Sequence, residues 1–441
     1  MNHEPHSTVV TRRELLQDSS ALFGATLLAG AAPPRTARGA PADVLRIALV
    51  GCGGRGTGAA LQALSTAGPV QLVAMADAFR DRLDSSLAEL ARNVPEHLDV
   101  PESRRFTGFE AHQRAIDVDV DVVLLATPPG FRPLHFEYAV SRGRHVFLEK
   151  PVAVDAPGVR RVLAASAEAK RRGLKVGVGL QRRHDPRYLE TVQRIRDGAI
   201  GEVQLLRCYW NGVRPWVRRR EAAWTEMEYQ MRNWYYFNWL CGDHIVEQHI
   251  HNLDVANWIR SSTPTSAQGQ GGRQGLEDPD QGEIFDHHAV EFTYADGTKL
   301  LSQCRQIPGC WESVSEHALG TEGAADVSGF HIQGRGGWEW SWRGEAVDPY
   351  QAEHDALFAA IRADVPYDES ETGALATLTA ILGRMATYSG RVVTWDEALS
   401  SSVDLSPQSY AWDAKPSVLP DASGRYPIAI PGAIPGSTPS V

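Results

Sequence analysis

The first segment of this chain whose residue types and spacing suggest a binding site is rich in glycine. Residues 51–56 have the spacing G-x-G-x-x-G, and they separate an apolar run, 46–50, from a stretch with helical periodicity. In that context the spacing is typical of a dinucleotide-binding loop, because its glycines permit a tight turn and close approach of the backbone to a pyrophosphate. The helix N-terminus then presents free N–H groups to the phosphates. The residues assigned to this loop are Gly51, Gly53, Gly54, Arg55 and Gly56.

An acidic residue, Asp77, ends the next apolar run, 69–76. A carboxylate at the end of the second strand accepts hydrogen bonds from the adenosine ribose and repels a 2′-phosphate. We therefore predict that the cofactor is NAD. Arg80 follows closely and is assigned to the same site, where its charge would favour NADP instead.

Lys150 follows another apolar run, 145–148. Side chains at the carboxyl end of a parallel strand face the cleft in which ligands bind. An ammonium in such a place can polarise a substrate oxygen and stabilise a developing alkoxide. The competing interpretation is an ordinary surface lysine in a strand-to-helix loop.

The segment 243–254 concentrates carboxylates and imidazoles. If it forms one helix, Asp243, Glu247, His251 and Asp254 share a face, because positions i and i+4 adjoin. Glu247 can then orient and charge-balance His251 while the imidazole takes a proton from a substrate. Asp243 fits equally well as the N-cap of this helix.

The same segment allows a metal interpretation, because His244, Glu247, His249 and His251 are residue types that bind zinc. On a continuous helix, however, positions i and i+2 point to different sides. His249 and His251 then do not share an ion, and we predict that the protein holds no metal.

These residues need a parallel sheet to bring them together. From residue 45 to about residue 172, apolar runs alternate with helical stretches, which is typical of a doubly wound α/β fold. The apolar runs are 46–50, 69–76, 121–126 and 145–148, and a further one is 175–179. The helical stretches are 56–66, 80–92, 131–142 and 157–172.

The second half of the chain has a different pattern. It contains strand-like runs, two of them joined by a hairpin turn at 295–298, and late helical patterns. The strand-like runs are 203–209, 288–294 and 299–305, and the helical patterns are 351–362 and 372–389. We therefore predict an N-terminal Rossmann dinucleotide-binding domain and a C-terminal α+β domain with a large, mostly antiparallel open sheet. The predicted boundaries are 1–40 for a signal and linker, 44–172 for the Rossmann domain, 173–400 for the α+β domain and 401–441 for an extended tail.

Three motifs together carry a resemblance to a known family. Residues 149–151 read Glu-Lys-Pro after one strand, and residues 126–129 read Ala-Thr-Pro-Pro after the strand before it. With the glycine-rich loop, they resemble the Gfo/Idh/MocA oxidoreductases over about residues 45–400. The resemblance implies a nicotinamide cofactor and a carbohydrate or polyol substrate, with Lys150 contacting the reacting hydroxyl. The other residues that we assign to the cofactor on this basis are Thr127, Pro128, His135 and Glu149.

A second signature of that family, Asp-x-x-x-His on a helix of the C-terminal domain, matches Glu247 and His251. Glutamate replaces aspartate here, which leaves the pairing of Glu247 open. The family's open sheet also implies a homo-oligomer formed through the C-terminal domain. Aromatic side chains, which can stack on sugar faces, crowd residues 209–239. The residues assigned to the substrate are Gln181, Arg183 and His249.

Three classes of function compete. The leading hypothesis is hydride transfer from a carbon bearing a hydroxyl to NAD, with Lys150 and His251 handling the proton. A redox-neutral NAD-dependent glycosidase or epimerase would instead use transient oxidation of a sugar. The third class is a non-catalytic regulator that senses sugar or NAD, and the presence of both Lys150 and His251 argues against it.

The composition of the chain restricts the classes of partner and of site that it can have. Hydrophobic residues make up 43% of the chain and charged residues 22%, which is typical of a soluble globular protein. The formal net charge of −10 argues against a nucleic-acid partner. The five cysteines have no short C-x-x-C spacing, so neither a disulfide framework nor a zinc motif is indicated. No segment is long and apolar enough to form a stable membrane span.

The N-terminal segment has the pattern of an export signal. Residues 11–16, Thr-Arg-Arg-Glu-Leu-Leu, resemble a twin-arginine signal, and the uncharged stretch 19–34 follows. We predict export by the twin-arginine pathway to a periplasmic or other extracytoplasmic location. Because free NAD is scarce there, we also predict a tightly bound cofactor that is regenerated within each catalytic cycle.

Overall fold

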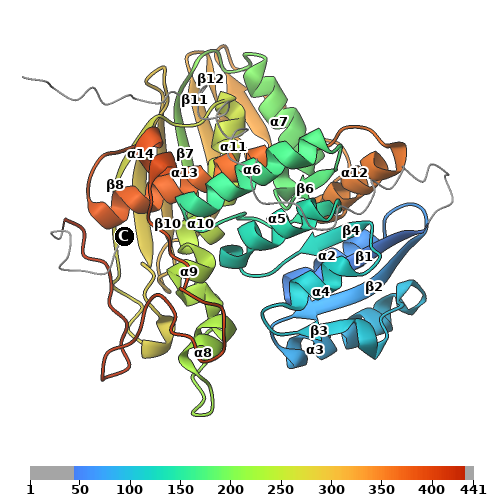
Figure 1. Ribbon diagram of the computed structural model, residues 1–441. Coiled ribbons are helices and arrows are strands. Elements are labelled where there is room, and N and C mark those ends of the chain that lie inside the picture. Colours follow the sequence, from blue (N-terminus) through green and yellow to red (C-terminus); the bar gives the residue numbers. More distant parts are fainter. Residues whose placement is uncertain (1–43, 433–441) are drawn as a thin grey trace, which may run out of the picture. The chain divides into compact units, whose positions relative to one another are not determined.

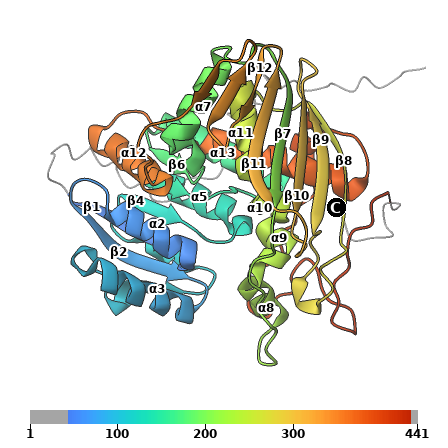
Figure 2. The same ribbon diagram turned by 180° about the vertical axis from the view of Figure 1, so that it is seen from behind.

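The computed structural model describes residues 44–432, and the predicted twin-arginine segment lies outside them. The described residues build two β-sheets, shown from opposite sides in Figures 1 and 2. By their contacts, both sheets belong to one compact unit that begins at Val44. Among the residues described, no helix is long and apolar enough to cross a membrane.

The first sheet is parallel throughout, and its apolar strands are buried on both faces. Its six strands stand in the order β3-β2-β1-β4-β5-β6, which confirms the Rossmann fold. Their bounds are β1 Leu45–Val50, β2 Val70–Asp77, β3 Arg105–Thr107, β4 Val122–Leu125, β5 His145–Leu148 and β6 Val176–Val178. No apolar run in the sequence predicts β3, because this strand has three residues of which only Phe106 is buried.

Helices cover both faces of this sheet (Figure 1). One face packs against α2 Gly54–Leu64, α3 Arg80–Asn93 and α12 Pro349–Ala363, and the other against α4 Ala111–Asp117, α5 Arg132–Ser141 and α6 Ala156–Arg171. Leu357 and Phe358 of α12 share an apolar cluster with Leu49 and Leu124. β6 and α12 both lie beyond residue 172 and pack with the first sheet. The return of α12 to this sheet is a feature that a linear boundary does not describe.

The second sheet has nine strands in the order β14-β13-β12-β11-β7-β10-β9-β8-β15. Their bounds are β7 Val203–Asn211, β8 Ser266–Gly272, β9 His287–Thr293, β10 Lys299–Arg305, β11 Ser313–Gly320, β12 Gly323–Asp326, β13 His331–Gly334, β14 Glu339–Ser341 and β15 Val393–Thr394. Every pairing is antiparallel except that of β7 with β10, so the sheet is mostly antiparallel, as predicted. The predicted hairpin is the β9–β10 pair, where Tyr294 N donates to Thr298 O at 2.9 Å.

Helices cover one face of the second sheet. α13 Ser370–Ser389 packs on β8 and β9, and α11 Ile250–Arg260 packs on β7 and β11. The remaining helices are α7 Pro186–Arg196, α8 Glu226–Arg232, α9 Asn238–Cys241, α10 His244–Glu247 and α14 Trp395–Ser400. Side chains of β10 alternate between buried and exposed, with Cys304 turned inward and Leu301 turned outward. The sheet therefore has one helix-covered face and one open face.

The segment 243–254 is not one continuous helix, so that prediction is wrong. α10 ends at Glu247 and α11 begins at Ile250. Between them, His249 N donates to His244 O at 3.2 Å, a bond to the fifth preceding residue that widens the turn. The polar stripe expected on one helix face is thereby divided. Asp243 does cap α10, where its carboxylate accepts a bond from the backbone N–H of His244.

Candidate active site

A cavity of about 590 Å³ lies at the carboxyl ends of the parallel strands, where ligands bind in open α/β sheets. The first half of the chain contributes the ends of β1, β2, β4 and β5 and the loops that follow them. The second half contributes the end of α10, the start of α11 and parts of the segment 210–234. The lining residues on which the chemistry depends are Gly53, Asp77, Thr127, Lys150, Glu247 and His251.

The glycine-rich loop has the geometry that a pyrophosphate needs. Gly51 has a φ of +98°, and a Cβ there would lie 2.5 Å from the backbone N of Thr127. A Cβ on Gly56 would lie 1.9 Å from Gly51 O, so neither position accommodates a side chain. Gly53 and Gly54 line the cavity, and a Cβ on either would meet nothing within 4 Å. Since α2 begins here without a side-chain cap, its first N–H groups are available to an anion.

Asp77 lines the cavity at the end of β2. Its Oδ2 accepts from Cys52 N at 2.7 Å, and its Oδ1 accepts from Phe79 N at 2.9 Å. Burial raises the pKa of Asp77 from its usual value, while these two backbone bonds act in the opposite direction. The carboxylate thus joins the glycine-rich loop to the end of β2.

Arg80 does not line the cavity, contrary to its assignment to the cofactor. Its guanidinium is exposed and pairs with Asp84, at 2.9 Å, and with Glu102. Arg82, which the sequence analysis did not single out, lines the cavity in its place. The physical reason is that acidic partners on α3 and in the loop before β3 hold Arg80 away.

Thr127, Pro128 and His135 all line the cavity. Thr127 Oγ1 lies 3.1 Å from Nδ1 of His135, whose ring stacks on His112 with centroids 4.0 Å apart. Burial lowers the pKa of His135 well below its ordinary value, and the neighbouring His112 and Arg132 add to that effect. His135 therefore contributes a neutral polar group to this wall.

Glu149 connects the glycine-rich loop to Lys150. Its buried Oε1 lies 3.0 Å from Arg55 Nε, and its Oε2 accepts from Lys150 N at 3.2 Å. A Cβ on Gly179 would lie 2.6 Å from that Oε2, so only glycine leaves room for the carboxylate. Glu149 thus fixes the backbone from which the Lys150 side chain projects.

Lys150 pairs with Glu247 rather than standing free. Its Nζ donates to Glu247 O at 2.7 Å and to Glu247 Oε1 at 3.0 Å. The two side chains are only 13% and 10% exposed, so this pair is held more firmly than an ion pair in solvent. Glu247 Oε2 has no hydrogen-bond partner within residues 44–432 and remains available as an acceptor.

His251 lies in the cavity wall with its ring stacked on Trp210, at 5.9 Å between centroids. Burial lowers the pKa of His251 well below 6.5, and the charges of Lys150 and Arg182 lower it further. The neutral imidazole can accept a proton, and its Nδ1 has no partner in the described part of the chain. The expected pairing with Glu247 is replaced by the Lys150–Glu247 pair.

Of the three residues assigned to the substrate, only one lines the cavity. Gln181 lines the cavity and donates to Tyr350 Oη at 3.0 Å. Arg183 does not line it, because its Nε and Nη2 both donate to the carboxylate of Asp254 at 2.8 Å. His249 is fully buried away from the cavity, with Nε2 2.7 Å from Ser302 Oγ. For Arg183 and His249 the structure therefore corrects the assignment.

Several lining residues were not foreseen. Arg132 is buried and donates to Pro151 O at 2.6 Å, and burial lowers the pKa of its guanidinium to about 10. No sequence motif distinguishes it from other arginines. The density of aromatic residues in 209–239 was the one available signal for the rest of this wall. The unforeseen residues include Arg82, Arg132, Arg218 and Tyr350, whereas Trp210, Trp216 and Trp234 belong to the aromatic segment that was expected to contact a sugar.

Two matches place the chain among known proteins. Residues 45–179 match the Gfo/Idh/MocA oxidoreductase family with its NAD-binding Rossmann fold, and residues 188–325 match the Gfo/Idh/MocA C-terminal domain. The inositol 2-dehydrogenase of Rhizobium meliloti (strain 1021) is 27% identical over 50% of this chain and 57% of its own length. That of Klebsiella pneumoniae (strain 342) is 33% identical over 34% of this chain and 38% of its own. The chain thus aligns with about half, or less, of these two relatives.

Solved structures share the fold. The aldose-aldose oxidoreductase from Caulobacter crescentus, complexed with glycerol, has a TM-score of 0.62 and 19% identity, covering 80% of this chain and 100% of that one. The scyllo-inositol dehydrogenase from Lactobacillus casei, with bound NAD(H) and scyllo-inositol, has a TM-score of 0.60 and 19% identity over the same shares.

The Rossmann sheet, the open glycine-rich loop and the acid at the end of β2 define a dinucleotide-binding protein. The helix α10 brings Glu247, the partner of Lys150, into the same cavity. With both family matches, the chain belongs to the Gfo/Idh/MocA oxidoreductases.

Proposed function

We propose that this protein is an NAD-dependent oxidoreductase that moves a hydride between a hydroxyl-bearing carbon of a carbohydrate or polyol and the cofactor. The observation that carries the proposal is that Lys150, Glu247 and His251 line the same cavity as the dinucleotide loop. The names of the relatives support the substrate class, since they include inositol 2-dehydrogenases and a scyllo-inositol dehydrogenase with bound NAD(H).

Lys150, Glu247 and His251 have different roles in the proposed hydride transfer. When bound, NAD supplies the hydride acceptor. Two of the ammonium N–H groups of Lys150 bond to Glu247, and the third is free for the substrate oxygen. As the C–H bond breaks, neutral His251 takes the hydroxyl proton while Lys150 stabilises the charge that develops on oxygen. The product is a carbonyl compound, and the electron pair has left with the hydride.

Aromatic walls support a sugar or cyclitol as the substrate. Trp210, Trp216 and Trp234 line the cavity, and Trp216 is 43% exposed. Indole rings stack on the C–H faces of such rings, while polar groups fix the hydroxyls. Gln181 and Arg218 are the polar lining residues that we assign to that task.

A substrate panel tests the proposal. The purified protein is given NAD and a set of inositols, aldoses and alkyl glycosides, and both cofactor absorbance and product composition are followed. We expect at least one compound to reduce NAD and give a ketone or lactone. If NAD binds but no compound is changed, the protein is a sensor of sugar or NAD and the catalytic proposal fails.

We propose as a second candidate a redox-neutral cycle on a cofactor that is never released. The C-terminal tail supports retention, because Tyr410 and Trp412 pack against residues of the cavity wall. Trp412 lies 5.4 Å from Phe79 and 4.7 Å from Phe109, and Tyr410 lies 5.4 Å from Phe131, between ring centroids. This cycle also fits the proposed twin-arginine export to a compartment poor in NAD. Such an enzyme would oxidise a sugar transiently, then hydrolyse or epimerise it and return the hydride.

Cofactor content separates the two candidates. The protein is purified without added nucleotide and denatured, and the supernatant is assayed for NAD and NADP. About one nucleotide per subunit, with turnover in the absence of added cofactor, supports the closed cycle. An empty protein that consumes NAD continuously is an ordinary dehydrogenase.

We also propose that the open face of the second sheet joins subunits. It carries apolar side chains exposed to solvent, among them Leu301 and Leu319. Light scattering should give the mass of an oligomer, and Leu301→Arg with Leu319→Arg should shift it to that of a monomer. A monomeric parent protein would refute this assembly.

A further inference from the structure

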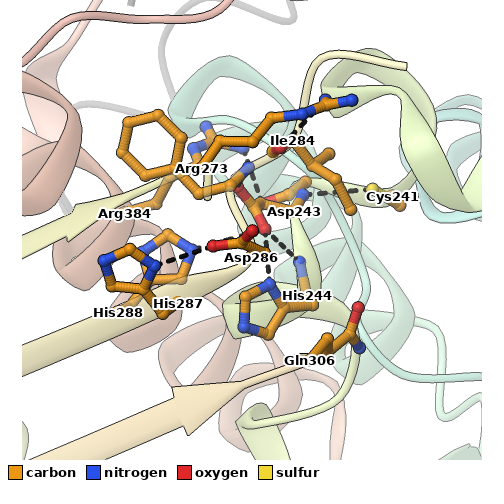
Figure 3. Close-up of polar contacts among 12 residues, drawn as sticks. Cys241, Asp243, His244, Arg273, Ile284, Asp286, His287, His288, Gln306 and Arg384 are labelled. Atoms are coloured by element: carbon orange, nitrogen blue, oxygen red, sulfur yellow. Dashed lines mark hydrogen bonds and ion pairs between the residues drawn. The ribbon is translucent and has the colours of Figure 1, made fainter. Parts of the chain in front are cut away.

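Three side chains converge in the protein interior, outside the cavity (Figure 3). Asp243 and His244 stand at the start of α10, and His288 comes from β9. All three have no solvent exposure, and one ligand atom from each lies within 4.8 Å of the other two. No sequence pattern connects His288 with residues 243 and 244, because only the fold brings β9 close to α10.

The spacing of these atoms suits a transition-metal ion. Asp243 Oδ1 lies 2.9 Å from His244 Nδ1 and 3.4 Å from His288 Nε2. Two ligands that are each about 2.0–2.1 Å from an ion lie roughly 2.9 Å apart at a right angle and about 3.4 Å apart at a tetrahedral angle. The two measured separations therefore match common coordination angles.

His288 has a nitrogen without a hydrogen-bond partner. Its Nε2 forms no hydrogen bond within residues 44–432, although it is fully buried and points to within 3.4 Å of the Asp243 carboxylate. A buried imidazole nitrogen without a partner costs stability, and a metal ion would satisfy it.

The outer atoms of two of the three side chains, His288 and Asp243, are already held by hydrogen bonds, as is usual for metal ligands. His288 Nδ1 lies 2.9 Å from Thr387 Oγ1, which fixes the ring with its Nε2 inward. Asp243 Oδ2 accepts from Tyr388 Oη at 2.6 Å and from Phe285 N at 3.0 Å. Its Oδ1 accepts from His244 N and lies 2.9 Å from His244 Nδ1, and this second contact is the one that an ion would replace. Such partners orient the ligands and are a regular part of built metal sites.

We propose that Asp243, His244 and His288 bind a divalent first-row transition ion such as Zn²⁺. Because the site is closed to solvent, the ion is structural. It holds Asp243, whose φ is +73°, at the start of the short helix that ends with Glu247. The ion thus supports the partner of Lys150 without touching the substrate.

Metal analysis of the intact protein is the first test. The protein is purified without chelator from zinc-supplemented medium, and its metal content is measured by mass spectrometry. We expect about one ion per subunit, retained through gel filtration, and an anomalous diffraction peak among the three side chains. Chelator-treated protein should take up one equivalent of Zn²⁺ or Co²⁺ again. If the parent stays metal-free after incubation with each of Zn²⁺, Co²⁺, Mn²⁺ and Fe²⁺, the cluster is only a hydrogen-bonded Asp–His network and the proposal is overturned.

A matched pair of variants tests the ligand assignment. His288→Gln should lower the bound metal by at least about 10-fold, whereas His287→Gln should leave it unchanged. His287 is the adjacent residue, partly exposed and bonded to Asp286 Oδ1 at 2.7 Å. Equal metal content in the two variants would refute the assignment. Should His288→Gln not fold, the parent's anomalous peak decides, because an ion located elsewhere contradicts the proposal.

Discussion

The two ends of the cavity are built in different ways. At the dinucleotide end, Gly51, Gly56 and Asp77 belong to one continuous β-α-β unit. Backbone contacts within that unit fix Gly56 and Asp77, and Gly51 also packs against the backbone of Ala126 and Thr127 after β4. At the proton-transfer end, Lys150 follows β5 while Glu247 ends α10, and 97 residues separate the two members of the pair.

This difference determines which substitutions each end of the cavity tolerates. The dinucleotide end depends on the absence of side chains at Gly51 and Gly56, so its geometry survives as long as the local strand and helix form. The proton-transfer end depends on how the second sheet and α10 pack against the first sheet. Substitutions at the two ends should therefore separate cofactor binding from turnover.

The largest effect is expected at Lys150. Lys150→Met removes the ammonium but keeps an unbranched side chain, and turnover should fall by about 10²-fold or more, the scale of a lost acid/base group. NAD affinity, measured by fluorescence titration, should stay within a few-fold of the parent. Near-normal turnover on the best substrate of the panel would contradict the role given to Lys150.

A loss of about 10²-fold is expected for His251→Ala, and the pH profile makes it specific. Burial lowers the pKa of His251 well below 6.5, so the imidazole is still neutral when the pH falls through 6.5. The parent's kcat/KM should accordingly show no loss of a base near pH 6.5. If a loss near pH 6.5 appears in the parent and disappears in His251→Ala, the imidazole is not held neutral by burial.

Glu247→Gln distinguishes the structure from the pairing expected on a single helix. The amide keeps the size and the backbone bond to Lys150 but removes the charge, and turnover should fall by about tenfold, between the effect of a surface pair and that of a catalytic group. Because Glu247 contacts Lys150 rather than His251, the acid side of the pH profile should not move. A shift of that side would mean that Glu247 acts on the imidazole after all.

The same contrast explains what the sequence could predict. The loop around Gly53, Asp77 and the strand ends follow from local rules, namely glycine spacing, apolar runs and the edge at which parallel strands end. The Lys150–Glu247 pair does not follow, because the widened turn at His249 rotates the two halves of the segment 243–254 relative to each other.

Charged residues show most clearly what cannot be predicted from the sequence. Arg80, Arg82 and Arg183 look alike in the sequence, and only their acidic partners decide which one reaches the cavity. Asp84 and Glu102 hold Arg80, Asp254 holds Arg183, and Arg82 lines the cavity. Asp84 lies one turn along α3 from Arg80, but Glu102 and Asp254 lie on other elements, so a local pattern reveals only part of these pairings.

The smallest effect is expected for cofactor choice, and it tests whether Arg80 or Arg82 contacts the nucleotide. The parent should bind NAD more tightly than NADP, because Asp77 would face a 2′-phosphate with like charge. Arg82→Ala should weaken dinucleotide binding by only about threefold, the scale of one solvent-accessible charge contact. Arg80→Ala is the matched control and should change neither affinity, because its guanidinium is occupied by Asp84 and Glu102. Isothermal titration of both variants with both nucleotides measures the four ratios. If Arg80→Ala shows the larger change, Arg80 leaves its acidic partners when the nucleotide binds. The assignment made from the sequence would then be right where the structure without nucleotide corrects it.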